Sequence, residues 1–193
     1  VAKGLSPQVL REKISKIRKL NRSYRDFKVL CGSEVDILSD GTLDYPDDVL
    51  AELDYVIASV HTSIKMPRDQ MTERILRAVS SGRIHILGHP TGRLFGARES
   101  YDIDLDCIME ACARHRVAME INSYPNRLDL SDENVFKARR YGVKFSINTD
   151  AHYVDMMESM RYGVWIAQRG HAGPGEVINC MDLHELTTWL KDR

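Results

Sequence analysis

Five side chains that could bind a divalent metal ion follow apolar, strand-like segments of the sequence. Glu34 closes the segment VLCGSE, His61 ends YVIASVH, and His89 follows IHILG. Asp150 and His152 end FSINTDAH, and on an extended chain residues two apart point to the same side. Imidazole and carboxylate groups without thiolates suit Zn, Mn or Fe, in a hydrolytic site rather than a structural one. We therefore predict a shared metal site with these five residues as ligands.

Each of these residues also has an ordinary structural interpretation. A single histidine at a strand end more often forms a hydrogen bond, and an aspartate after a threonine more often caps a turn. Five such residues at equivalent positions favour a common site, because the carboxyl ends of parallel strands form the rim where active sites are built. The remaining histidines do not fit this pattern and are predicted to be structural or solvated: His85, His115, His171 and His184.

Basic residues follow the same strand ends and could contact the phosphate of a substrate. They are Lys65, Arg93, Arg98 and Arg127. Arginine is suited to bidentate contacts with phosphate, although ordinary surface charge is an equally good explanation for each of them. Glu120 and Asn122, near the end of AMEIN, are predicted to orient the ligands or to reach the site directly.

The elements that must position these residues alternate between strand and helix. Strands are expected at 28–38, 54–61, 83–90, 116–125, 143–152 and 176–180. Helices are expected from Pro7 after an N-cap at Ser6, at 67–81, 104–115, 131–141 and 156–169, and after Asp182. Short connections without linkers predict one α/β domain over 1–193, with a parallel sheet that is either doubly wound or closed as a barrel.

The composition is that of an ordinary globular protein. The 193 residues are 43% hydrophobic and 28% charged, with a net charge of -1, which excludes a histone-like DNA wrapper. No apolar run reaches the ~20 residues of a membrane helix, and the first residues do not resemble a signal peptide. The four cysteines form no CxxC pair, so we expect free thiols and a cytoplasmic location. Without an initial Met, the chain looks like part of something longer.

Several segments together resemble the PHP (polymerase and histidinol phosphatase) domain, in the form found at the carboxyl end of bacterial family X DNA polymerases. They are GSEVDIL, DGTLDYPDDVLAELDYVIASVHTS, ILGHPTGRL, MEINSYPNRLDL and INTDAHY, and the resemblance covers essentially the whole chain. It implies a distorted (βα)7 TIM-like barrel. It also implies up to three divalent metal ions at the strand ends, Mn²⁺ or Zn²⁺, with Fe²⁺ as a further option.

The resemblance also implies roles for individual residues. Glu34 would bridge metals, His61 and His89 would complete one metal site with it, and Asp150 and His152 would serve the other two. Glu34, His61 and Asp150 would be the catalytic residues. The implied activity is a Mn-dependent 3′–5′ exonuclease and phosphoesterase that trims DNA ends in repair. Its partners would be DNA 3′ ends and an upstream polymerase domain, with no membrane.

The chain departs from the family pattern at its start. The HxH motif of the first strand, a further His and carboxylate, and the first one or two strands are expected upstream of Val1. We therefore expect an open-edged barrel that is poorly active alone. Two other functions remain open: a small-molecule phosphatase of the histidinol phosphatase type, and a non-catalytic structural or DNA-binding module. An amidohydrolase-type barrel is disfavoured, because no strand-end Lys stands where a carbamylated bridge would be needed.

Overall fold

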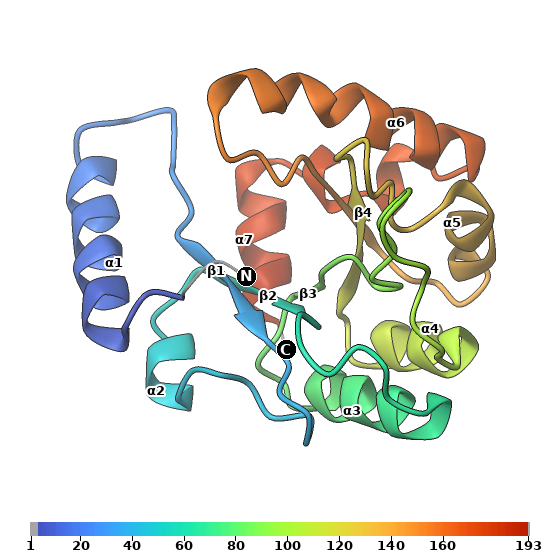
Figure 1. The fold of residues 1–193 in the computed structure, drawn as a ribbon. Coiled ribbons are helices and arrows are strands. Elements are labelled where there is room, and N and C mark those ends of the chain that lie inside the picture. Colours follow the sequence, from blue (N-terminus) through green and yellow to red (C-terminus); the bar gives the residue numbers. More distant parts are fainter. Residues whose placement is uncertain (1–3, 193) are drawn as a thin grey trace.

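A single parallel sheet organises the chain in the computed structural model, which describes residues 4–192 (Figure 1). Within these residues its five strands lie side by side in chain order, each parallel to the next. They are β1 (Gly32–Asp36), β2 (Tyr55–Ser59), β3 (Ile86–Leu87), β4 (Ala118–Asn122) and β5 (Phe145–Asn148). The alternating α/β class with a parallel sheet is therefore as predicted.

Helices connect and cover these strands. The α-helices are α1 (Pro7–Asn21), α2 (Asp47–Leu50), α3 (Arg68–Ser80), α4 (Leu105–Arg114), α5 (Asp132–Arg139), α6 (Met160–Arg169) and α7 (Leu183–Lys191). Three 3-10 segments are η1 (Val154–Ser159), η2 (Pro174–Glu176) and η3 (Ile178–Cys180). The predicted starts hold: Ser6 caps α1, and Asp182 forms a capping box with Glu185 at the start of α7.

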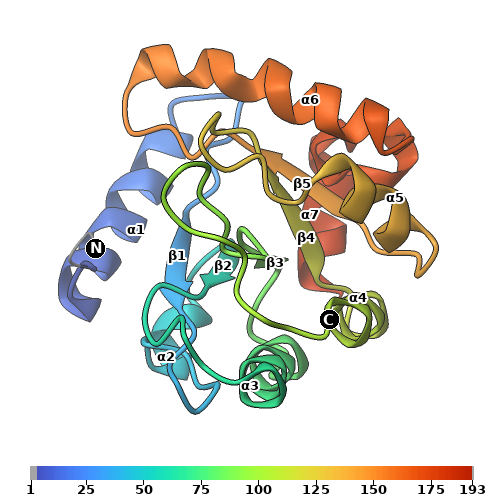
Figure 2. The same cartoon turned by 45° about the vertical axis from the view of Figure 1, so that its right-hand side comes forward.

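The two faces of the sheet differ in what covers them. On the outer face, residues such as Val56, Ala58 and Met119 join the main core with the helices that surround the sheet (Figure 2). On the inner face, Tyr55 and Ile57 pack with Ile86 and with the side chains of α7. Side chains alternate between the two faces along a strand, so Val56 and Ala58 point to the outer face, and Tyr55 and Ile57 point to the inner face.

Polar residues of the strands share this inner face, toward the strand ends. A cavity of about 450 Å³ lies there, with apolar lining from Tyr55, Ile57 and the α7 residues Leu186 and Leu190. Its polar lining comes from neighbouring strands and the turns after them: Glu34, Glu120, Asn122, Ser146, Asn148 and Asp150. The fold thus gathers carboxylate and amide groups at the carboxyl ends of β1, β4 and β5.

The structure corrects several predicted boundaries. The strand predicted at 176–180 is wrong, because these residues form turns of 3-10 helix, with one isolated parallel bridge between Val177 and Phe145. β5 ends at Asn148, so Asp150 and His152 do not lie on an extended strand, and Asp150 has a φ of 53°. The short helix α2 was not predicted, and the helix predicted at 156–169 is η1 followed by α6.

The sheet has two edges within residues 4–192, one at β1 and one at β5. These residues show an α/β fold compatible with part of a TIM-like barrel. None of the helices described here has both the length and the apolar character needed to cross a lipid bilayer.

Candidate metal centre

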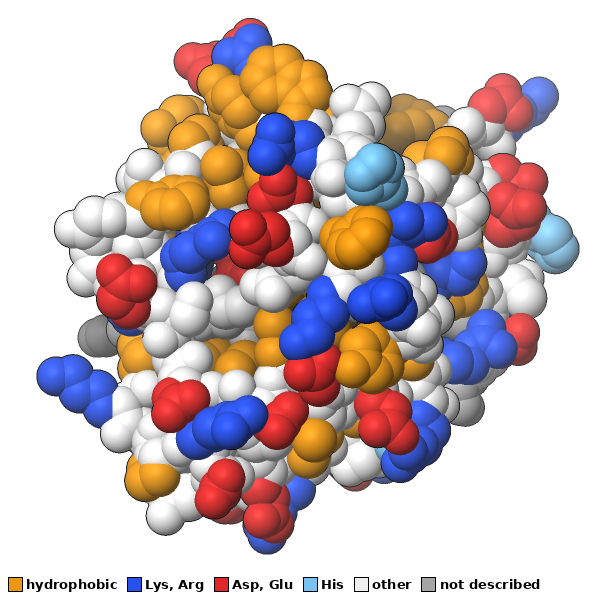
Figure 3. Space-filling model, turned by 90° about the vertical axis from the view of Figure 1, so that its right-hand side faces the viewer, with side chains coloured by type: hydrophobic (Ala, Val, Ile, Leu, Met, Phe, Trp, Pro, Cys, Tyr) orange, Lys and Arg blue, Asp and Glu red, His pale blue; other side chains and the backbone are white. Residues whose placement is uncertain are grey.

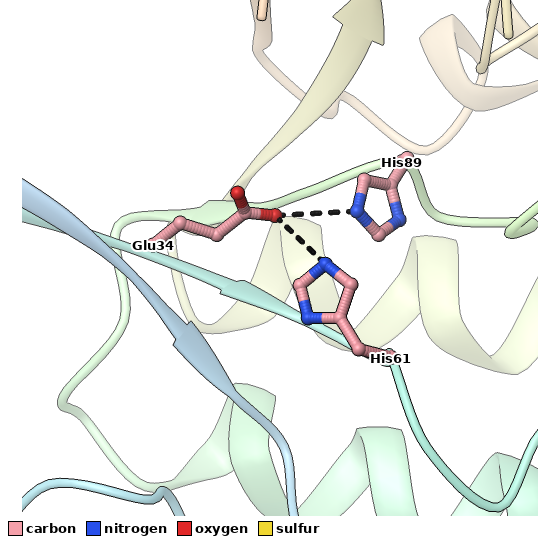
Figure 4. A group of neighbouring side chains, drawn as sticks. All are labelled: Glu34, His61 and His89. Carbon is pink, nitrogen blue, oxygen red and sulfur yellow. Dashed lines mark ion pairs between the residues drawn. The ribbon is translucent and has the colours of Figure 1, made fainter. Parts of the chain in front are cut away.

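Three of the five predicted metal ligands converge on one point (Figure 4). Nε2 of His61 lies 3.4 Å from Oε1 of Glu34, and Nε2 of His89 lies 3.2 Å from the same oxygen. One ligand atom from each residue lies within 4.8 Å of the others. Glu34 comes from β1, while His61 and His89 follow β2 and β3, so adjacent parallel strands deliver all three side chains to one edge.

Asp36 holds the His61 ring from the side opposite Glu34. A carboxylate oxygen of Asp36 contacts Nδ1 of His61, which directs Nε2 of the same ring toward Glu34. The backbone amide of Asp36 in turn donates to Oδ1 of Asp44 at 2.9 Å. A carboxylate on the far nitrogen of a histidine is a common way to fix the ring and its tautomer for metal binding. The sequence prediction missed this residue.

His89 is set into the protein interior, with 2% of its side chain exposed. Its backbone is in the left-handed region, with a φ of 27°, and its amide donates to Oε2 of the buried Glu120 at 2.6 Å. Glu120 also accepts from Nδ2 of Asn148 at 2.8 Å. Glu120 therefore fixes the backbone from which the His89 ring projects.

The three side chains suit a divalent cation. Both ring nitrogens of His89 are buried, and among the described residues neither forms a hydrogen bond, although Nε2 has the 3.2 Å ion-pair contact with Glu34. A buried polar atom without a partner is costly, and a metal ion would satisfy the nitrogen that faces Glu34. Two imidazoles and one carboxylate are also an established ligand set for zinc and similar ions.

The pKa shifts in this group favour a negative Glu34. Burial alone would raise the pKa of Glu34, but the His61 and His89 rings that face it lower that pKa well below its usual range. The hydrogen bond to Glu34 raises the pKa of His61, and Asp36 acts in the same direction. The carboxylate thus stays charged and prefers a cation beside it.

The other two predicted ligands lie outside this group of three. Asp150 lines the same cavity as Glu34, and its carboxylate accepts from Nδ2 of Asn122 at 3.4 Å. His152 is 72% exposed, and its Nδ1 lies 2.8 Å from the backbone oxygen of Asp150. Their roles as ligands of further metal ions therefore stay predictions.

The predicted basic residues lie on the loops that follow β2, β3 and β4. Arg93 donates to the backbone oxygens of Arg127 and Leu128, and Arg98 donates to that of Gly92 at 2.7 Å. Arg127 is 14% exposed, and its Nε lies 3.9 Å from Oδ2 of Asp150. Lys65 is exposed after His61. The structure gives the positions of these four side chains, and their contact with a substrate phosphate stays a prediction.

Two further buried residues shape the site, and the sequence analysis did not find them. Asp129 accepts from the backbone amides of Thr91 and Gly92, just after His89. Arg74 of α3 is 2% exposed and donates to backbone oxygens of Ile37, Leu38 and Thr62, which directly follow Asp36 and His61. Asp129 lies in the quoted segment RLDL, but nothing in the sequence marks it as buried. Arg74 looks like one of many helix-surface arginines.

Comparison with known proteins gives relatives of two kinds. The chain is 42% identical over 191 residues to the Bacillus subtilis "DNA polymerase/3'-5' exonuclease PolX", covering 99% of this chain and 34% of that protein. It is 33% identical over 146 residues to a "probable phosphatase" of Thermoanaerobacter and 36% identical over 145 residues to another of Clostridium acetobutylicum. Each of these matches covers 70% of this chain and 57% of the relative.

The chain thus spans about a third of the polymerase and somewhat more than half of the phosphatases. No family model matches it. The alignment with PolX nevertheless spans 99% of the chain, including the segments that hold Glu34, His61 and His89. These relatives are the ones expected for a PHP domain of a family X DNA polymerase, in agreement with the resemblance seen in the sequence.

Proposed function

We propose that this chain is a metal-dependent phosphoesterase domain that removes nucleotides from DNA 3′ ends. The observation that carries the proposal is the convergence of Glu34, His61 and His89 at the ends of three adjacent strands. This group occurs in a chain that is 42% identical to a protein named as a 3'-5' exonuclease. The relatives support a hydrolase of phosphate esters, and DNA as the substrate is the further step of this proposal.

In such a reaction, the residues of the site would have three roles: binding metal ions, orienting the histidines and positioning the phosphate. Glu34, His61 and His89 would hold the first metal ion, and Asp150 and His152 would contribute to further ions. Bound divalent ions supply a water of lowered pKa and neutralise charge on the phosphoryl oxygens. Asp36 and Glu120 keep the two histidines in place, and Arg127, beside Asp150, would position the phosphate of the substrate. Mn²⁺ is the ion we expect, with Zn²⁺ and Fe²⁺ as alternatives.

The proposal also covers the domain organisation of the protein, its partner domain and its location in the cell. We assign residues 1–193 to one PHP domain, whose five observed strands belong to a distorted (βα)7 barrel. A polymerase domain on the same polypeptide is the expected partner, in DNA repair, because PolX is named as a polymerase. The expected cytoplasmic location belongs to the same proposal, because the PolX relative is named as an enzyme of DNA.

The direct experiment uses the full-length protein with a 5′-labelled oligonucleotide and Mn²⁺. We expect stepwise shortening from the 3′ end, and we expect the double variant Glu34→Ala, His61→Ala to lose it. His184→Ala is the matched control, since His184 is an exposed residue of α7. Full activity in the double variant would refute the proposal.

A small-molecule phosphatase is the second candidate, because the Thermoanaerobacter and Clostridium relatives are named as phosphatases. The metal group would be the same, so the substrate decides between the two. Faster hydrolysis of a sugar phosphate than of a single-stranded oligonucleotide would favour the phosphatase. A non-catalytic module is the third candidate, and purified protein holding less than one equivalent of metal would support it.

A further inference from the structure

The loop after His89 presents an aromatic ring to solvent on a rigid support. Leu94 and Arg98 pair through two backbone hydrogen bonds of 2.8 Å, which close a short hairpin around Phe95. Gly96 takes a φ of 71°, a conformation that glycine adopts without strain. The amide of Phe95 also donates to the backbone oxygen of Asn126 at 2.7 Å, so the hairpin is fastened to the loop after β4. Figure 2 shows these two loops side by side.

Phe95 itself is 52% exposed. The guanidinium carbon of Arg93 lies 4.6 Å from the centre of its ring. Arg93 is held by the backbone oxygens of Arg127 and Leu128, so the ring rests on an anchored cation. An exposed phenylalanine supported in this way is a flat apolar surface that loses little freedom when a ligand stacks on it.

Three arginines, Arg93, Arg98 and Arg127, lie on the two loops that carry and support the ring, with the carboxylates of Asp129 and Asp150 near them. The hydrogen bonds of Arg93 and Arg98 go to backbone oxygens, and Arg127 approaches Asp150 only at 3.9 Å. Acidic and basic side chains are interleaved on the face seen in Figure 3. The two loops hold the three arginines near one another, since Arg93 donates to the backbone of Arg127 and the charge of Arg127 acts on Arg98. Their charge complements a polyanion, and the exposed ring adds an apolar partner for a base.

We propose that Phe95, supported by Arg93, is a stacking subsite for a nucleobase of the DNA strand whose 3′ end occupies the metal centre. The inference rests on the proposed function and adds the means of selecting an oligonucleotide. A stacked base and a phosphate lie next to each other in a nucleotide, as do the ring and the arginines here. A small phosphate ester has no base to reach Phe95, so this contact would favour DNA over such esters.

The test compares Phe95→Ala with the wild-type full-length protein on two substrates in Mn²⁺. For an oligonucleotide, we expect KM to rise about 5- to 150-fold, the range of one lost base stack, with kcat within about 2-fold. For a sugar phosphate, which has no aromatic ring, we expect no change. Phe95→Trp should restore the oligonucleotide KM, since indole offers a larger stacking face. Phe136→Ala is the matched control, because Phe136 of α5 is equally exposed.

A binding measurement makes the test independent of hydrolysis. An oligonucleotide with 2-aminopurine near its 3′ end should lose fluorescence on binding to the wild type but not to Phe95→Ala. An unchanged KM with unchanged quenching would overturn the inference, as would equal loss on both substrates. If the wild type quenches the fluorescence without cutting DNA, the hydrolase proposal fails while the stacking subsite stands.

Discussion

The carboxylate of Asp36 contacts Nδ1 of His61, while Nε2 of that ring faces Oε1 of Glu34 at 3.4 Å. Asp36 and Glu34 lie two residues apart on β1 and therefore on the same side of the strand. One strand thus supplies a candidate metal ligand and the residue that orients a second ligand. This arrangement leads to the first prediction.

Replacing Asp36 by Asn should weaken metal binding by about 10- to 100-fold, the usual cost of losing the partner of a histidine ligand. The amide no longer stabilises the Nδ1-protonated ring as a carboxylate does, so Nε2 is a poorer ligand. Isothermal titration with Mn²⁺ or Zn²⁺ measures the change. Asp40→Asn is the control, since among residues 4–192 the Asp40 carboxylate accepts hydrogen bonds only from Thr42, within its own turn. Equal affinity in both variants would contradict the orienting role.

Arg74→Met should destabilise the fold by about 3 kcal/mol, because it leaves the buried backbone oxygen of Ile37 without its donor and removes one donor each from the part-buried oxygens of Leu38 and Thr62. Urea unfolding measures the loss. Arg77→Met, one turn further along α3, removes an exposed pair with Glu73 and an exposed hydrogen bond to the backbone oxygen of Asp40, and should cost less than about 1 kcal/mol. Similar costs for the two variants would show that Arg74 does not hold the strand ends together.

Glu176 should contribute stability that depends on pH. Burial would raise its pKa, but hydrogen bonds from the Gly173 amide and from Arg139 lower it overall. A folded-state pKa below the unfolded value, about 4.3, means that the contribution is complete above that pH. It is then lost as the pH falls through the folded pKa.

Glu176→Gln should therefore cost about 1 kcal/mol at pH 7 and less at pH 3, as measured by urea unfolding at both values. Glu158→Gln, on the exposed η1, is the control and should show little difference at either pH. A cost for Glu176→Gln that is the same at pH 3 and pH 7 would rule out this linkage.

The sequence was sufficient to predict an α/β fold with a parallel sheet and the convergence of Glu34, His61 and His89, because apolar β-branched runs and the residues at their ends follow the pattern of a parallel sheet. It was insufficient at 176–180, where Val177 forms a single bridge and η3 follows it, since a short apolar run does not distinguish a strand from a turn. Asp36 and Arg74 were missed because their partners are distant in the sequence and only tertiary packing brings them together.

The placement of Asp150 shows a related limit. The direction of its side chain was predicted by assuming an extended chain from 143 to 152. In the structure the strand ends at Asn148, and Asp150 has a positive φ. Local alternation predicts which residues reach the end of a strand, but not the turn conformation beyond it. For the same reason, the loops that carry Phe95 and Arg127 could be located but not oriented.

The central claim is that Glu34, His61 and His89 together bind a metal ion. Metal content after dialysis, measured by inductively coupled plasma mass spectrometry on the full-length protein, tests it most directly. We expect His89→Asn combined with Glu34→Gln to lose at least one equivalent of metal relative to the wild type, while His184→Asn retains the wild-type content. Wild-type metal content in the double variant would contradict the account.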